Sequence, residues 1–165
     1  MTSTRGPSTS LRLASPEERG TILRLFSERF GVPGEEFSAY ELFLRGRNVW
    51  IIRRSEHLWL ASELSPHTLG MRLATYTNLG LKPSTYAIQV FGRVATRNIA
   101  HLDRDGAQAF LRGQTIVRRF DLDPGFVIVA WDKVPLGCGL YSPAGLLKSL
   151  VPKRVRQDAP RIPPV

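Results

Sequence analysis

The chain has 165 residues, of which 42% are hydrophobic and 22% are charged. This length fits one ordinary domain or two small ones, and such a chain buries roughly two-thirds of its unfolded surface, enough for a core without disulfides. Its one cysteine, Cys138, excludes an internal disulfide and a cysteine zinc site, so we expect an intracellular, cytoplasmic protein. The apolar runs are far shorter than the ~18–20 residues that cross a bilayer, and the N-terminus has no apolar signal-peptide stretch, so neither a membrane protein nor a secreted one is expected.

Basic residues exceed acidic ones and concentrate in the second half of the chain. There are 23 Lys and Arg residues against 14 Asp and Glu residues, a net charge of +9, and 19 of the 23 are Arg. Residues 1–80 carry a net charge of +2, and residues 81–165 carry +7. Because the Arg guanidinium suits phosphate oxygens and stacks on bases, this excess predicts an anionic partner such as nucleic acid, bound by the second half.

The first predicted elements are a tail and a helix. Residues 1–14 are rich in Ser and Thr and hold no acidic residue, which favours a disordered tail. A helix is predicted over residues 16–30, because Ser15 and Glu18 have the spacing of a capping box and Gly31 follows the last turn. Its apolar residues recur every three or four positions, which predicts one buried face.

Short strands are predicted next. Strand-forming residues flank a turn at residues 46–48, which indicates a hairpin of residues 40–45 and 49–54. Residues 57–61 and 71–76 are two further predicted strands, joined by a polar loop.

Helix signals then return on both sides of an expected boundary. A short helix is predicted over residues 83–91, ending at Gly92. A second unit begins near Asn98, where Asp103 is a suitable N-cap for a short helix closed by Gly113.

The rest of the chain is predicted to be β structure. Residues 126–131 and 136–141 are apolar strands separated by a turn, and short strands at this spacing are typical of a small barrel. The basic, proline-rich end from residue 152 onward is expected to fray into a tail. 

The predicted organisation is therefore an α+β fold of two small domains between two tails. The parts are a disordered tail over residues 1–14, an α/β domain over 15–95, a β pseudo-barrel over 96–157 and a basic, proline-rich tail over 158–165.

Four motifs in the second half resemble the PUA domain, a small RNA-binding pseudo-barrel found in many RNA-modifying enzymes. They are the Leu102-Asp103 start, F-L-R-G at residues 110–113, G-F-V-I-V-A at 125–130 and P-L-G-C-G-L-Y at 135–141. This resemblance spans about residues 98–156.

Further motifs resemble the small α/β domain that precedes the PUA domain in Nip-seven-like ribosome-biogenesis proteins and in Sun-type RNA cytosine-5 methyltransferases. They are F-G-R-V-A-T-R-N at residues 91–98 and E-R-F-G-V-P at 28–33. An ending of the form G-L-L-K-S-x-x-P-K, like that at 145–153, also occurs in the Sun-type enzymes. The combined resemblance covers roughly residues 16–157. Because 165 residues leave no room for the cofactor-binding domain of such an enzyme, the resemblance implies the binding part without the methyltransferase domain.

The resemblance implies a protein that binds structured rRNA or tRNA and serves as an adaptor or positioning module in RNA modification or ribosome assembly. Its implied partners are RNA and a separate RNA-modifying enzyme or assembly factor, and it implies no cofactor. In PUA domains the nucleic acid lies against the short helix, the glycine-containing strand and the last strand, with the glycines allowing close approach of a backbone. The RNA-binding residues implied here are Arg112, Gly137, Gly139, Lys148, Lys153, Arg154 and Arg156.

Two arginines near the domain junction have two open interpretations. Arg93 and Arg97 either extend the track of phosphate contacts between the domains, or pair with Asp103 and Asp105 and brace the domains together.

Two aromatic residues also have two open interpretations, base stacking and core packing. Trp131 and Tyr141 are predicted at strand ends, where they either stack on unpaired bases or fill the core. Trp50 and Trp59 stand within apolar runs and are expected in the core.

No catalytic constellation is found in the sequence, so a non-enzymatic role is expected. Cys138 has no basic neighbour in sequence, which favours a buried structural thiol. His57, His67 and His101 lack the spacing of metal ligands, so no metal site is expected. Two other classes stay open, an enzyme acting on RNA or nucleotides and a protein-interaction scaffold that docks a partner through the N-terminal helix and hairpin.

Overall fold

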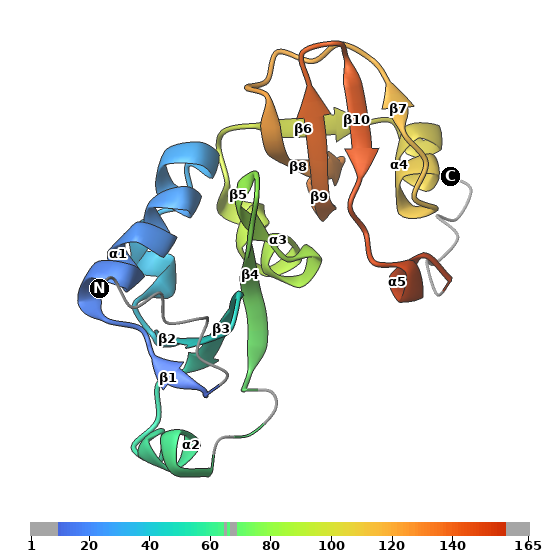
Figure 1. Cartoon of the computed structure of the whole chain (residues 1–165). Helices are drawn as coiled ribbons and strands as arrows, with labels where there is room; N and C mark the ends of the chain where they lie inside the picture. The colour runs from blue at the N-terminus through green and yellow to red at the C-terminus, as the bar shows by residue number, and fades with distance from the viewer. Residues whose placement is uncertain (1–9, 65, 67–68, 158–165) are drawn as a thin grey trace, which may run out of the picture.

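Two five-stranded sheets form the computed structural model of the chain, which describes residues 10–64, 66 and 69–157 (Figure 1). The first sheet comes from the N-terminal half and the second from the C-terminal half, with a short helix between them (Figure 1). This arrangement of helices and two curled sheets confirms the predicted α+β fold with a small pseudo-barrel. Within the described residues, every helix is too short or too polar to cross a membrane.

The first sheet is antiparallel and follows chain order. Its strands are β1 (Arg12–Leu13), β2 (Tyr40–Arg45), β3 (Asn48–Arg53), β4 (Met71–Thr77) and β5 (Gly80–Pro83). The predicted hairpin and the predicted strand at 71–76 are confirmed by β2, β3 and β4.

The predicted tail needs a correction at its end. Arg12 and Leu13 pair with Leu44 and Phe43 of β2, so they extend the sheet. The backbone of a sheet edge offers hydrogen bonds to any neighbouring chain, regardless of its composition. Residues 1–9 of the predicted tail lie outside the described residues.

The predicted helix at residues 16–30 is confirmed as α1 (Pro16–Arg24), continued by the π-helical turn η1 (Leu25–Arg29). Ser15 and Glu18 make both hydrogen bonds of the expected capping box. Gly31 ends the helix with φ of +64°, a conformation that glycine adopts without strain. The short 3-10 helix η2 (Gly34–Phe37) follows.

The predicted strand at residues 57–61 is wrong, because this region contains the helix α2 (Trp59–Leu64). A short apolar run does not by itself distinguish a strand from a helix. Trp59 is 58% exposed, so its predicted place in the core is also wrong. Trp50 is half-buried on β3.

The helix α3 (Thr85–Phe91) confirms the prediction at residues 83–91. The side chain of Ser84 caps it by accepting a hydrogen bond from the backbone N–H of Ala87. The 3-10 helix η3 (Gly92–Val94) follows directly, so the chain stays helical beyond Gly92.

The second sheet has the strand order β6-β8-β9-β10-β7. Its strands are β6 (Ile99–Leu102), β7 (Ile116–Val117), β8 (Gly125–Trp131), β9 (Val134–Ser142) and β10 (Leu146–Ser149). β6 pairs in parallel with β8, and the other neighbours are antiparallel. The helix α4 (Arg104–Leu111) connects β6 to β7, and the Asp103 side chain caps it as expected.

The expected fraying after residue 152 is corrected by the helix α5 (Lys153–Gln157). Arg156 anchors this helix, since its Nε donates a hydrogen bond to the carbonyl oxygen of Val151 at 2.7 Å. Its guanidinium group lies against Gly113, at the end of α4, where a side chain would collide with it. Residues 158–165 lie outside the described residues.

The largest core cluster joins the two halves of the chain. It contains Phe26, Phe37 and Phe91 from the N-terminal half together with Phe126 and Cys138 from the second sheet. A second cluster lies inside the C-terminal sheet and α4. Because the two halves share apolar packing, their surfaces meet at a fixed interface. The division between residues 95 and 96 stays a prediction.

Candidate nucleic-acid interface

The C-terminal end of α4, the end of β10 and α5 meet at one corner of the second sheet. The hydroxyl of Ser149 on β10 donates a hydrogen bond to the carbonyl oxygen of Phe110 on α4 at 2.8 Å. Arg156 of α5 closes the corner by its contacts with Val151 and Gly113. Five of the predicted RNA-binding residues belong to these elements. They are Arg112, Lys148, Lys153, Arg154 and Arg156, a set that we call the C-terminal basic face, in which Lys148 points to the side of β10 opposite to the buried Ser149.

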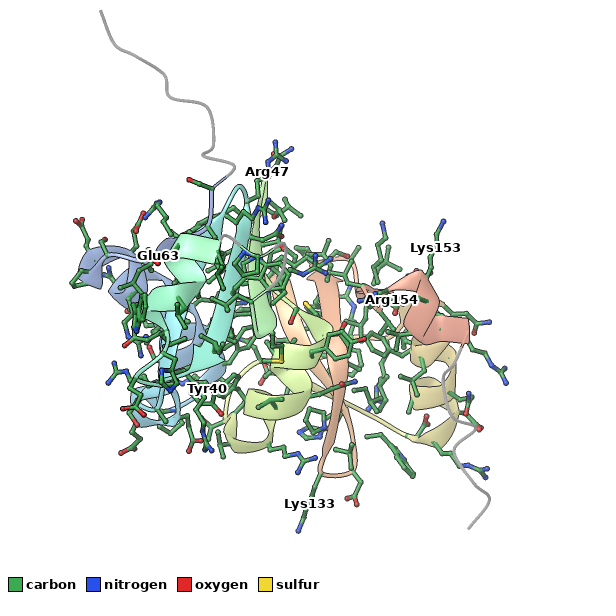
Figure 2. The ribbon with its side chains drawn as sticks, turned by 90° about the horizontal axis from the view of Figure 1, so that it is seen from below. Tyr40, Arg47, Glu63, Lys133, Lys153 and Arg154 are labelled. Atoms are coloured by element: carbon green, nitrogen blue, oxygen red, sulfur yellow. The ribbon has the colours of Figure 1, made fainter. Side chains whose placement is uncertain are left out.

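Four cations of the C-terminal basic face are free to bind an anion. Arg112, Lys148, Lys153 and Arg154 are exposed, and their charged groups make no hydrogen bond or ion pair with any other described residue. Figure 2 shows Lys153 and Arg154 projecting from α5. When an unpaired surface cation contacts a phosphate, it releases counterions that were condensed on the nucleic acid, and this release favours binding.

Arg156 differs from its neighbours because its guanidinium group is already engaged. Besides the bond to Val151, one terminal nitrogen donates to the carbonyl oxygen of Ser149 at 3.5 Å. Arg156 therefore positions α5, and with it Lys153 and Arg154.

The two glycines predicted to admit an RNA backbone are buried and face the chain's own side chains. A Cβ at Gly139 would lie 2.6 Å from Leu147 Cδ1 and 2.9 Å from Val129 Cγ2. A Cβ at Gly137 would lie 3.1 Å from Thr85 Cγ2. The expectation of a close RNA approach is therefore corrected, since the space left by each glycine is filled by core packing.

Arg93 and Arg97 are exposed, and neither stands on the elements that carry the C-terminal basic face. Gly92, next to Arg93, packs against Pro135 near the start of β9, and Figure 2 shows Lys133 of the preceding turn on the side of the molecule opposite to Lys153. Arg97 donates to the carbonyl oxygen of Glu28 at 3.3 Å. The alternative pairing with Asp103 and Asp105 is not observed among the described residues, in which the Asp103 carboxylate caps α4.

Three cations that sequence reasoning did not select lie at the junction of the halves. Arg47, Arg72 and Lys82 line two adjoining hollows between the β4–β5 hairpin and the second sheet, which we call the inter-sheet groove. No local signal marks these residues, because packing between distant strands brings them together.

Of the aromatic candidates, Tyr141 belongs to the core. It is 6% exposed, and its hydroxyl both accepts from the N–H of Phe120 and donates to its carbonyl oxygen, at 3.0 Å each. Trp131 is half-buried at the end of β8 and packs against the second core cluster.

Of the groups weighed for catalysis or metal binding, Cys138 lies in the core, and His67 lies outside the described residues. Cys138 is fully buried, and burial raises the pKa of its thiol to about 12, so the thiol is protonated at neutral pH as expected of a structural cysteine. Among the residues that the structure describes, no three His, Cys, Asp or Glu side chains are grouped so that they could hold a metal ion.

The comparison with protein families agrees with this geometry. Residues 97–157 match the family described as the methyltransferase RsmF PUA domain. No curated protein matches the chain. The match supports the resemblance to the PUA domain of Sun-type methyltransferases and covers β6 to α5, including the whole C-terminal basic face. Residues 97–157 thus form a PUA-like domain, and since this domain is an RNA-binding module, a general role in RNA binding is supported.

Proposed function

We propose that the chain binds structured RNA, either rRNA or tRNA, and acts in the cytoplasm as an adaptor or positioning module for RNA modification or ribosome assembly. In this proposal, catalysis is performed by a separate partner, such as an RNA-modifying enzyme. The similarity of residues 28–33 and 91–98 to the domain preceding the PUA domain in Nip-seven-like proteins supports the assembly setting.

The C-terminal basic face carries this proposal. Three of its free cations stand on the last strand and helix, and Arg112 stands at the end of α4, all in a domain that matches an RNA-binding family. Residues 97–157 hold ten Lys and Arg residues against five Asp residues, so the domain attracts a polyanion. Binding of this kind reads the backbone and shape of a folded RNA.

The test is fluorescence anisotropy with labelled tRNA and rRNA hairpins across a salt series. The variant Lys153→Ala/Arg154→Ala removes two free cations and leaves the Arg156 anchor intact. The matched control is Arg24→Ala/Lys133→Ala, which removes two exposed charges elsewhere. We expect the wild type and the control to bind with micromolar or tighter affinity. In the test variant, the slope of log affinity against log salt concentration should be smaller in magnitude by about two. Absence of RNA binding by the wild type, or equal losses in both variants, would overturn the proposal.

A second candidate, a protein-docking scaffold, is favoured by one observation on the N-terminal half. Leu13, Phe43, Leu58 and Trp59 line a hollow of about 590 Å³ beside α2, where Trp59 is 58% exposed and Leu64 is 74% exposed. Exposed apolar clusters of this kind are typical of protein contacts. A partner retained by the wild type and lost by Trp59→Ser, with RNA binding unchanged, would support this role.

A further inference from the structure

The inter-sheet groove consists of two hollows with volumes of about 460 Å³ and 260 Å³. Thr75, Thr77 and Lys82 of the β4–β5 hairpin line both hollows, as does Leu150 just after β10. The hollows are therefore adjacent. Beside the hairpin, the larger hollow is lined by Phe126 of β8 and Leu140 of β9, and the smaller one by Tyr86 of α3 and Pro152.

The two hollows repeat the same chemistry. The larger one contains Arg47 and Tyr76, and the smaller one contains Arg72 and Tyr86, with Lys82 shared between them. Tyr76 is 40% exposed and Tyr86 is 41% exposed, so each ring offers surface to a ligand. No Asp or Glu is among the described residues that line either hollow.

This combination fits a single nucleic-acid strand. Positive side chains track the phosphates, and aromatic rings stack on unpaired bases, which every base allows because each has a π-face. The charged groups of Arg47, Arg72 and Lys82 make no hydrogen bond or ion pair with other residues of the described ranges, so they are available for phosphates.

The groove continues into the C-terminal basic face. Lys148 on β10 pairs with Leu140 on β9, and Leu140 lines the larger hollow. Pro152 lines the smaller hollow and directly precedes Lys153 at the start of α5. Figure 2 shows Arg47 and Lys153 projecting on the same side of the molecule, whereas Lys133 projects on the opposite side. A strand that leaves the C-terminal basic face can therefore enter the groove.

We infer that the inter-sheet groove binds a single-stranded segment of the same RNA, with phosphates at Arg47, Arg72 and Lys82 and unpaired bases on Tyr76 and Tyr86. This inference rests on the proposed function and adds a substrate feature to it. The ligand is a folded RNA with an unpaired extension, and the two halves of the chain bind it together.

The test compares an RNA hairpin with a blunt end and the same hairpin with a single-stranded overhang of several nucleotides. The variant Arg47→Ala/Arg72→Ala removes two exposed cations, and Arg24→Ala/Lys133→Ala again serves as the matched control. The wild type and the control should bind the overhang hairpin about tenfold more tightly than the blunt one. The groove variant should bind both hairpins with the affinity of the wild type for the blunt one. Thermal unfolding of each variant verifies that the fold is kept.

A second variant tests the stacking without changing charge. Tyr86→Leu keeps apolar bulk and removes the ring face, so it should lower the affinity for the overhang hairpin and the quenching of a 2-aminopurine base placed in the overhang. Polyglutamate of equal charge serves as the competitor that represents an acidic peptide. It should displace the overhang hairpin poorly, because it offers no base to stack.

The outcomes separate this inference from the proposed function. If the wild type binds both hairpins equally, and the groove variants change neither affinity, the inference fails while RNA binding at the C-terminal basic face stands. If polyglutamate displaces the overhang as well as RNA does, the groove is a general anion site and the inference fails. If the wild type binds neither hairpin, the proposed function fails as well.

Discussion

The guanidinium group of Arg29 donates a hydrogen bond from Nε to the carbonyl oxygen of Phe126 at 2.6 Å. A terminal nitrogen of the same group donates to the carbonyl oxygens of Asp123 and Pro124, at 3.0 Å each. One side chain at the end of the first helix thus binds the backbone at the beginning of β8, 97 residues further along the chain. It holds together the two halves that form the inter-sheet groove.

Arg29→Ala is expected to destabilise the protein by about 2–3 kcal/mol, because hydrogen bonds from a charged donor are lost and their acceptors lose their partners. The free energy of unfolding from urea denaturation measures this change. Arg24→Ala is the control, since Arg24 is exposed and its terminal nitrogen donates a hydrogen bond to the Thr21 hydroxyl at 3.3 Å. Its stability should stay within about 0.5 kcal/mol of the wild type. Equal stability of the two variants would show that the Arg29 contacts do not hold the halves together.

The buried glycine on β9 gives a second test. Gly139→Ala would place a Cβ 2.6 Å from Leu147 Cδ1 and 2.9 Å from Val129 Cγ2, so the core must shift, and a loss of about 1–3 kcal/mol is expected. Gly20→Ala meets nothing within 4 Å on α1 and should stabilise the protein by about 0.5–1 kcal/mol. Chemical denaturation of both variants should therefore give opposite signs. A neutral Gly139→Ala would contradict the close packing of β9 against β8 and β10.

Local sequence signals predicted the elements whose chemistry is local. Ser15 and Asp103 each cap the helix that their position indicated, because a cap depends only on residues within one turn. The apolar strand at 126–131 also follows from a short pattern. The residues of the C-terminal basic face were selected through the resemblance to the PUA domain.

Features that depend on distant contacts could not be predicted in the same way. Arg12 and Leu13 become ordered by pairing with β2, and α5 is fixed by the contact of Arg156 with Gly113. Arg47 and Lys82 meet at the inter-sheet groove because the β4–β5 hairpin packs against the second sheet. The local sequence around these residues, in spacing or composition, does not indicate this packing.

The lowered pKa of Glu18 predicts a loss of folding stability in acid. The hydrogen bond from Arg12, helped by the backbone N–H of Ser15, lowers the pKa of the Glu18 carboxyl from 4.5 to about 2. A lowered pKa in the folded state stabilises the protein above pH 4.5, and this contribution is lost as the pH falls from 4.5 toward 2.

The measurement is the free energy of unfolding between pH 2 and pH 6 for the wild type and Glu18→Gln. The variant should show a shallower decline in acid. Glu17→Gln removes a charge from the same turn without removing the capping box, so it should retain the wild-type slope. Identical acid profiles of the wild type and Glu18→Gln would contradict the role of the carboxylate.

The raised pKa of the Cys138 thiol predicts a loss of folding stability at alkaline pH. Burial raises the pKa of its thiol from 9.0 to about 12 in the folded protein. Between these values the unfolded chain loses the thiol proton and the folded chain keeps it, so stability declines as the pH rises from 9.0 to about 12.

A thiol reagent at pH 8 should react with Cys138 only at the rate at which the protein unfolds, because the thiol of the folded protein is both buried and protonated. Cys138→Ala removes the titrating group and should flatten this part of the alkaline decline relative to the wild type. Rapid labelling of the folded protein, insensitive to added denaturant, would show that β9 opens locally and that the packing around Cys138 is not maintained in solution.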